Sequence, residues 1–170
     1  MSRQVFTEHP LRETPAIQSW VALLRSHRAL TRQFSNDLLN EHALTLNDYE
    51  VLLYLAREPE RRLRRVDLAD RVLLTPSGIT RLLDGLERAG YVARATCDSD
   101  ARVTYAVLTE KGLAKLREAA PTHLASICDA FGAVLSPEEL ETLAELLGRL
   151  SNGGRTEACA PESAAGAVSR

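Results

Sequence analysis

The sequence contains few cysteines, and none of them is arranged to form a metal site or a disulfide framework. Cys97, Cys128 and Cys159 form no Cys-x-x-Cys pair and have no histidine nearby at the spacing of a zinc ligand. The four histidines (His9, His27, His42 and His123) belong to no recognisable catalytic motif. We therefore expect no metal, no cofactor and no enzymatic activity.

Long apolar runs are also missing. No stretch approaches the roughly 18 consecutive apolar residues of a membrane-spanning helix. Residues 1–12 lack the apolar core of a signal peptide. We therefore expect a cytoplasmic protein.

Charge is unevenly distributed along the chain. The 170 residues carry a net charge of -2, and 45% of them are hydrophobic, which is typical of a folded domain. Residues 61–94 contain eight arginines and four acidic residues, a net charge of +4, so the remainder carries -6. A basic middle segment on an acidic frame fits a DNA-facing surface, and it also fits a solvated charged face.

Helical periodicity dominates both ends of the chain, after an N-terminal arm over residues 1–15. From residue 16 onward, apolar or partly apolar residues alternate at spacings of three and four and form one seam. The seam consists of Ile17, Trp20, Leu24, His27, Thr31, Phe34 and Leu38. Toward the other end, Thr109 caps a long predicted helix, and the Ser136 to Glu139 capping box opens the last one. From residue 152 the chain is rich in Gly, Ala and Ser, so we expect a disordered tail.

The middle segment predicts three helices followed by a hairpin. Thr45 is the predicted N-cap of the first of these helices, and a short helix follows around residues 67–72. Thr75 and Pro76 open the third helix, which Gly90 ends. Residues 91–96 and 103–108 are rich in β-branched and aromatic residues, which indicates a β-hairpin.

Two short helices followed directly by a hairpin form a winged helix-turn-helix. The predicted fold is mainly α with a small β-hairpin wing (α+β). A DNA-binding lobe spans residues 45–108, and residues 16–44 and 109–151 form a helical dimerisation base of the same domain. In the second helix of the motif, Ile79, Leu82, Leu83 and Leu86 form the buried stripe. Arg81 lies on the opposite face, where it can read guanine through two hydrogen bonds.

The order and spacing of these motifs resemble those of the MarR (multiple-antibiotic-resistance regulator) family from Ile17 to Leu150. The resemblance rests on Thr80 to Asp84 in the reading helix, Gly90-Tyr91-Val92 at its exit, Asp100-x-Arg102 in the wing and Leu108-Thr109-x-x-Gly112 after it. It implies that Arg102 enters the minor groove and that Asp100 orients it. The full set of predicted DNA contacts is Thr75, Pro76, Ser77, Gly78, Thr80, Arg81, Arg88, Arg94, Asp100 and Arg102.

The resemblance also implies a homodimer that binds a pseudo-palindromic operator as a repressor and is released by a small aromatic or phenolic ligand. Candidate residues for lining the ligand pocket are Trp20, His27, Arg28, Tyr49 and His123. Core packing is the alternative role for Trp20 and Tyr49. The alternative functions are a redox- or pH-responsive regulator of the same fold, and a helical interaction module that does not bind DNA.

Overall fold

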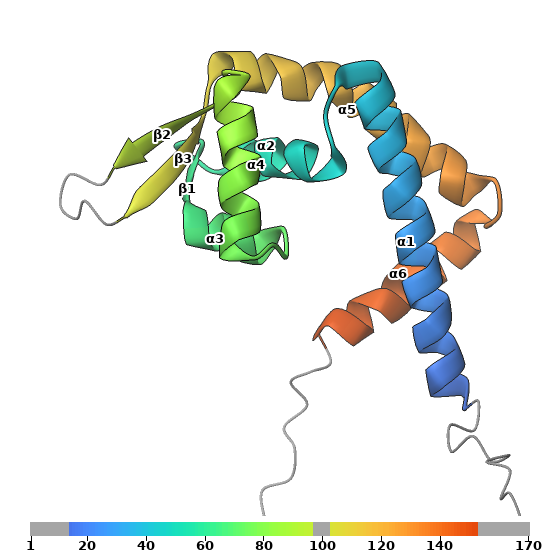
Figure 1. Ribbon diagram of the computed structural model, residues 1–170. Helices are drawn as coiled ribbons and strands as arrows, with labels where there is room; N and C mark the ends of the chain where they lie inside the picture. The colour runs from blue at the N-terminus through green and yellow to red at the C-terminus, as the bar shows by residue number, and fades with distance from the viewer. Residues whose placement is uncertain (1–13, 97–102, 153–170) are drawn as a thin grey trace, which may run out of the picture. The chain divides into compact units, whose positions relative to one another are not determined.

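The computed structural model describes residues 14–96 and 103–152. Along the chain these residues form nine elements, which are labelled in Figure 1. They are α1 (Pro15–His42), α2 (Leu46–Arg57), β1 (Arg62–Arg64), α3 (Arg65–Arg71), α4 (Pro76–Arg88), β2 (Val92–Thr96), β3 (Thr104–Leu108), α5 (Glu110–Gly132) and α6 (Pro137–Asn152). The mainly helical fold with a hairpin wing is confirmed. The predictions for the N-terminal arm, the wing tip and the tail concern residues outside the described ranges, apart from the few that border them.

The chain consists of two compact units, the first ending at Cys128 and the second beginning at Asp129. The first contains α1 to β3 and most of α5, and the second contains the end of α5 and α6. The predicted division into a lobe and a base follows different boundaries and stays a prediction. Within the described residues, none of the helices is both long and apolar enough to cross a membrane.

Capping by side chains explains where the helices begin. Thr45 is the N-cap of α2 as predicted, and Asp48 completes a capping box: the Thr45 hydroxyl accepts from the Asp48 N–H at 3.2 Å, and the Asp48 carboxylate accepts from the Thr45 N–H at 2.9 Å. Ser136 and Glu139 form the same arrangement at the start of α6, with distances of 3.3 and 2.8 Å. These helix starts are therefore determined locally, as the sequence predicts.

The hydrophobic core of the first unit lies where α2, α3 and α4 meet the sheet. Its members come from elements far apart in the sequence, and seven of its large side chains are almost completely inaccessible to solvent. These are Leu38, Leu44, Val51, Leu52, Leu55, Leu68 and Ile79. Each such side chain contributes about 1.5 to 3 kcal/mol through burial, so the core holds the reading helix in place.

The sheet has three antiparallel strands in the order β1, β3, β2. β2 and β3 form the predicted hairpin, with Arg94 opposite Ala106. β1 was not predicted from the sequence; it pairs with β3 and places buried Leu63 opposite Ala106. The wing is therefore a hairpin extended by one short strand.

Thr109 joins the end of the hairpin to the end of α4. Its hydroxyl accepts from the Gly112 N–H at 3.0 Å, which caps α5 as predicted. The same hydroxyl lies 2.7 Å from the Gly90 carbonyl and 3.1 Å from the Tyr91 carbonyl. Gly90 has a φ of 76°, a conformation that glycine adopts without strain, and it ends α4 as predicted. α5 then continues through Pro121 to Gly132.

Candidate nucleic-acid interface

The reading helix α4 presents one buried and one exposed face. Ile79, Leu83 and Leu86 are buried, whereas Leu82 is only partly buried. Thr75 caps the helix, because its hydroxyl accepts from the Gly78 N–H at 3.1 Å, and Pro76 occupies the first turn as predicted. The face opposite the core is therefore free to approach another molecule, and its N-terminal end carries only small side chains.

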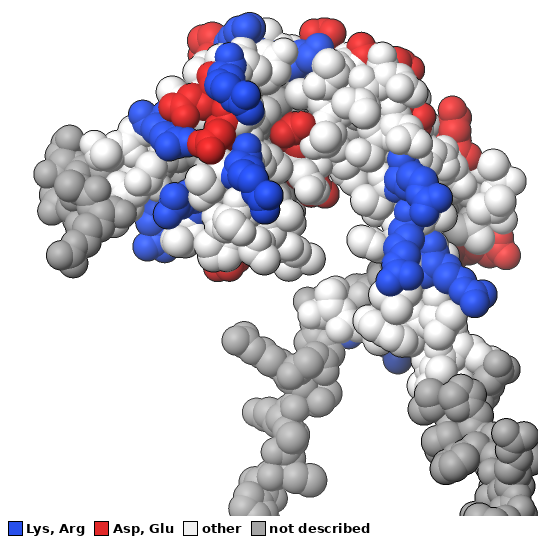
Figure 2. All heavy atoms as spheres, in the orientation of Figure 1, with Lys and Arg blue, Asp and Glu red and all other residues white. Residues whose placement is uncertain are grey.

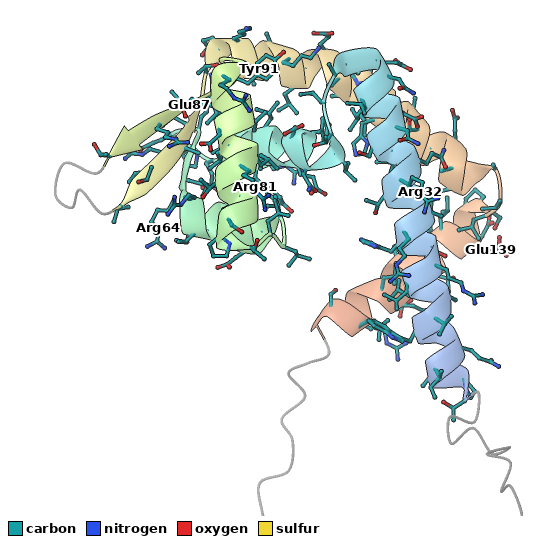
Figure 3. The ribbon with its side chains drawn as sticks, viewed as in Figure 1. Arg32, Arg64, Arg81, Glu87, Tyr91 and Glu139 are labelled. Atoms are coloured by element: carbon teal, nitrogen blue, oxygen red, sulfur yellow. The ribbon has the colours of Figure 1, made fainter. Side chains whose placement is uncertain are left out.

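Arg81 is exposed near the middle of that face (Figure 3). Its Nε lies 3.4 Å from the Ser77 carbonyl, which is a long contact within the helix. Within residues 14–96 and 103–152, Arg81 forms no ion pair. Its guanidinium can therefore donate hydrogen bonds from both terminal NH2 groups to a base edge.

Ion pairs engage most of the other arginines of the basic segment. Arg64 makes two hydrogen bonds to the Asp67 carboxylate, at 2.7 and 2.8 Å. These bonds raise the pKa of Arg64 and lower that of Asp67. Figure 2 shows acidic side chains among the basic ones on the face that carries α4. Of the eight arginines between residues 61 and 94, those without an ion pair in the described chain are Arg65, Arg81 and Arg88.

Arg65 is a site candidate that the sequence analysis missed. It is exposed at the start of α3, and its Nη1 lies 3.5 Å from the hydroxyl of Thr80 on α4. Thr80 itself donates to the Pro76 carbonyl at 2.8 Å. The only sequence signal for Arg65 is its place in the basic segment, because a contact between positions 65 and 80 depends on how the two helices cross.

Arg94 lies on β2 and is held by α4. Its guanidinium forms ion pairs with both Asp84 and Glu87, the latter with an Nε to Oε2 distance of 2.9 Å. Glu87 lies on the side of α4 next to the hairpin (Figure 3). The predicted direct contact of Arg94 with DNA would therefore require it to leave two carboxylates. Asp100 and Arg102 lie outside the described residues, so their assigned roles stay predictions.

The structure brings together two of the five candidates for the ligand pocket. The ring of His123 on α5 packs against Tyr49 on α2, with centroids 4.6 Å apart, and edge-on against Phe34 on α1 at 5.6 Å. Nδ1 of His123 is buried and has no hydrogen-bond partner within the described chain. Burial lowers the pKa of His123 and raises that of Tyr49.

The other three candidates lie on exposed parts of α1. Trp20 is 58% exposed. His27 and Arg28 border a shallow, polar hollow on this helix, together with Thr31, Arg32, Ser35 and Asn36. Figure 2 shows a group of basic side chains on α1. The described chain thus contains an aromatic cluster and a separate polar surface, rather than one pocket formed by all five residues.

His42 was also missed, and it connects α1 to α5. Its Nε2 lies 2.8 Å from the Thr122 hydroxyl, and its Nδ1 lies 3.3 Å from Oε1 of Glu118. Thr122 in turn donates to Glu41 at 3.0 Å. No sequence pattern indicates these contacts, since the partners are 76 and 80 positions apart.

A capped reading helix, a preceding helix packed against it and a hairpin wing define a winged helix-turn-helix DNA-binding protein. Residues 43–103 match the MarR family. The regulator MhqR of Bacillus subtilis is 32% identical over 135 residues, which cover 79% of this chain and 90% of that protein. The chain belongs to the MarR family of DNA-binding transcriptional regulators, and it is not an enzyme.

Solved structures of family members have the same fold. AbsC, a MarR family regulator of Streptomyces coelicolor, is 36% identical, with a TM-score of 0.74 over 85% of this chain and 98% of AbsC. Sco3205 of the same organism, solved in complex with DNA, is 28% identical, with a TM-score of 0.76 over 90% of this chain and 97% of Sco3205. The winged-helix arrangement is therefore shared with a protein whose structure contains DNA.

Proposed function

We propose that the chain is a homodimeric repressor whose α4 helices read two related half-sites of an operator. The observation that carries this proposal is the exposed face of α4, on which Arg81 is free of ion pairs within the described residues. Arginine forms two parallel hydrogen bonds with guanine in the major groove, and small residues at the helix start allow close approach to the backbone. A dimer with two-fold symmetry reads an inverted repeat. Repression then needs only that the bound dimer exclude other proteins from the site.

Exposed apolar side chains support dimerisation. On α1, Trp20, Val21 and Leu23 are between 37 and 58% exposed. On α6, Leu150 is 71% exposed and Leu146 is 48% exposed. Clusters of exposed apolar side chains of this kind mark association surfaces in soluble proteins. Both helices therefore contribute to the proposed dimer interface, together with α5.

The proposed effector is a small aromatic or phenolic molecule. Of the five candidate residues, Tyr49 and His123 lie together, whereas Trp20, His27 and Arg28 lie on exposed parts of α1. His123 has the clearest reason for inclusion. Its buried Nδ1 lacks a partner in the described chain, and an unsatisfied buried polar atom is costly. A ligand hydroxyl at this position would satisfy it.

DNA recognition is tested by comparing Arg81→Ala with Arg117→Ala, a control that removes one exposed charge from α5. An operator is first selected from genomic fragments. Arg81→Ala should then weaken the free energy of binding to that operator by about 1 to 3 kcal/mol, whereas binding to random DNA should be almost unchanged. Arg102→Ala should weaken binding to A·T-rich flanks and reduce its salt dependence. Unchanged operator affinity for both Arg81→Ala and Arg102→Ala, with unchanged circular dichroism, would favour the interaction module that does not bind DNA.

Release by an effector is tested separately. A panel of aromatic acids and phenols is screened for loss of operator binding by the wild-type dimer. His123→Phe should then retain operator affinity and lose the response to the active compound. A response that is unchanged in this variant would remove His123 from the proposed site.

A further inference from the structure

The ion pairs of Arg94 connect the reading helix directly to the wing. Asp84 and Glu87 are three positions apart on α4, so their side chains lie on the same side of the helix. Both carboxylates contact the guanidinium of Arg94 on β2. Arg94 is opposite Ala106 in the hairpin, so a restraint on Arg94 also restrains β3.

Packing between α4 and the strands is incomplete at this point. A small hollow lies there, bordered by Leu83 and Glu87 of α4, Val92 and Arg94 of β2, and Tyr105 of β3. Gly90 lies in the short turn that joins α4 to β2. Leu83, Leu86 and Val92 are buried in the core, and the hollow lies beside them. The ion pairs cross the outer side of this junction, where they can fix the angle between helix and hairpin.

The three charged side chains are each between 41 and 46% exposed. A single ion pair at such exposure contributes little to stability, whereas a network held in fixed geometry contributes more. An arginine on a wing can contact DNA phosphate, or it can enter the minor groove, as the family resemblance implies for Arg102. Here two carboxylates already neutralise the guanidinium, which makes it a poor phosphate ligand in this arrangement.

We propose that Arg94 is a positioning residue, which Asp84 and Glu87 hold so that the wing leaves α4 at the angle required for helix and wing to engage DNA together. This inference rests on the proposed mode of DNA recognition, and it changes the role of Arg94 within it. It makes Asp84 and Glu87 favourable for binding although they place negative charge beside DNA.

The test uses the full-length chain with the variants Arg94→Ala, Asp84→Asn/Glu87→Gln and the triple combination. Asp70→Asn is the control, because it removes an exposed acid of α3 that forms no ion pair within the described residues. Hydrogen exchange of the hairpin amides is measured without DNA. Operator affinity is measured at fixed salt concentration, and hydroxyl-radical footprints report protection of the flanks and the centre.

We expect the double variant to exchange its hairpin amides faster and to bind the operator more weakly, each by about fivefold or more, although it removes two negative charges. Protection of the flanks should be lost, while protection by α4 remains. The triple variant should bind no more weakly than Arg94→Ala, because all three residues act through one restraint.

Three results would overturn the proposal. The first is unchanged hairpin exchange in both Arg94→Ala and the double variant. The second is equal or tighter operator binding by the double variant, since electrostatic repulsion from DNA alone predicts tighter binding. The third is additive loss in the triple variant, which would mean that Arg94 contacts DNA independently. If the wild-type chain binds no operator, the proposed function fails, and the exchange measurement still decides whether these ion pairs fix the hairpin.

Discussion

Burial of apolar side chains differs between two parts of the molecule. One is the inner segment from Phe34 to Ala119, and the other consists of the helical segments outside it. Every buried side chain of the described chain lies between Phe34 and Ala119. In contrast, residues 15–33 of α1 and the described side chains of α6 include none that is buried, although both segments are rich in leucine. The inner segment therefore contains the hydrophobic core, whereas the outer segments leave their apolar side chains exposed, which suits association.

This difference separates two kinds of free energy. Substitutions in the inner segment should change the free energy of unfolding, and substitutions in the outer segments should change the free energy of association. The winged helix-turn-helix belongs to the inner segment, so its geometry should survive loss of the dimer, although tight operator binding should not, because that requires two linked half-sites.

The largest expected effect is loss of the dimer. Leu147→Asp in α6 or Leu24→Asp in α1 places a charge in the proposed interface, and an unpaired buried charge costs about 3 to 5 kcal/mol. Sedimentation should show monomers at micromolar concentration, and operator binding should be lost. Glu145→Gln serves as a control on an exposed position of α6. A dimer that persists in both aspartate variants would contradict the assignment of the outer segments.

Next in size is a cavity in the core. Leu52 is completely buried, so Leu52→Ala should lower the free energy of unfolding by about 2 to 5 kcal/mol in urea titrations. Leu150→Ala is the same substitution at a side chain that is 71% exposed, and it should leave the unfolding of the inner segment nearly unchanged. Equal losses in the two variants would remove the distinction between the segments.

A smaller, stabilising effect is expected at Gly85 in α4. A Cβ at this position meets no atom within 4 Å, and alanine is about 1 kcal/mol more favourable than glycine inside a helix. Gly85→Ala should therefore raise the free energy of unfolding by about that amount without changing the dissociation constant of the dimer. Decreased stability in urea titrations would show that this helix position is constrained in another way.

The smallest expected effect is on how the free energy of unfolding depends on pH, through His123 at the edge of the core. Burial lowers the pKa of His123, so the folded state favours the neutral imidazole. As pH falls below the ordinary value of about 6.5, the unfolded state binds more protons and stability decreases. His123→Phe keeps a ring between Phe34 and Tyr49 but cannot titrate, so its free energy of unfolding should vary less between neutral and acidic pH. His27→Phe, which alters an exposed histidine, should keep the pH dependence of the wild-type chain. If it reduces that dependence as much as His123→Phe does, burial of His123 is not the cause.

Local signals in the sequence predicted much of this fold. Thr45, Thr75 and Ser136 bond to backbone groups within three residues, so their caps can be read from neighbouring positions. Gly90 marks the end of α4 because its positive φ suits glycine. Ala43, Arg61 and Leu73 also adopt positive φ, and none of them was predicted to do so, since these residue types carry no such signal.

Nonlocal contacts account for what the sequence did not predict. β1 has only three residues and exists because β3 pairs with it, so no periodicity can develop within it. From the sequence alone, an arginine in the predicted hairpin is expected to contact DNA. Only the packing of α4 beside β2 shows that Asp84 and Glu87 reach Arg94. The same holds for His42, whose partners lie on another helix.

One close contact determines which substitutions this protein can accept. A Cβ on Gly112 would overlap the carbonyl oxygen of Tyr91, in backbone that cannot move without shifting the junction of α4, hairpin and α5. A Cβ added to Gly85 or to Gly148 would meet no atom within 4 Å. In a saturation library selected for a folded chain, position 112 should return glycine alone, while positions 85 and 148 should return many residues. Three helical glycines that look equivalent in the sequence thus differ in evolutionary freedom, and the Tyr91 carbonyl group, together with the Leu108 side chain, sets the difference.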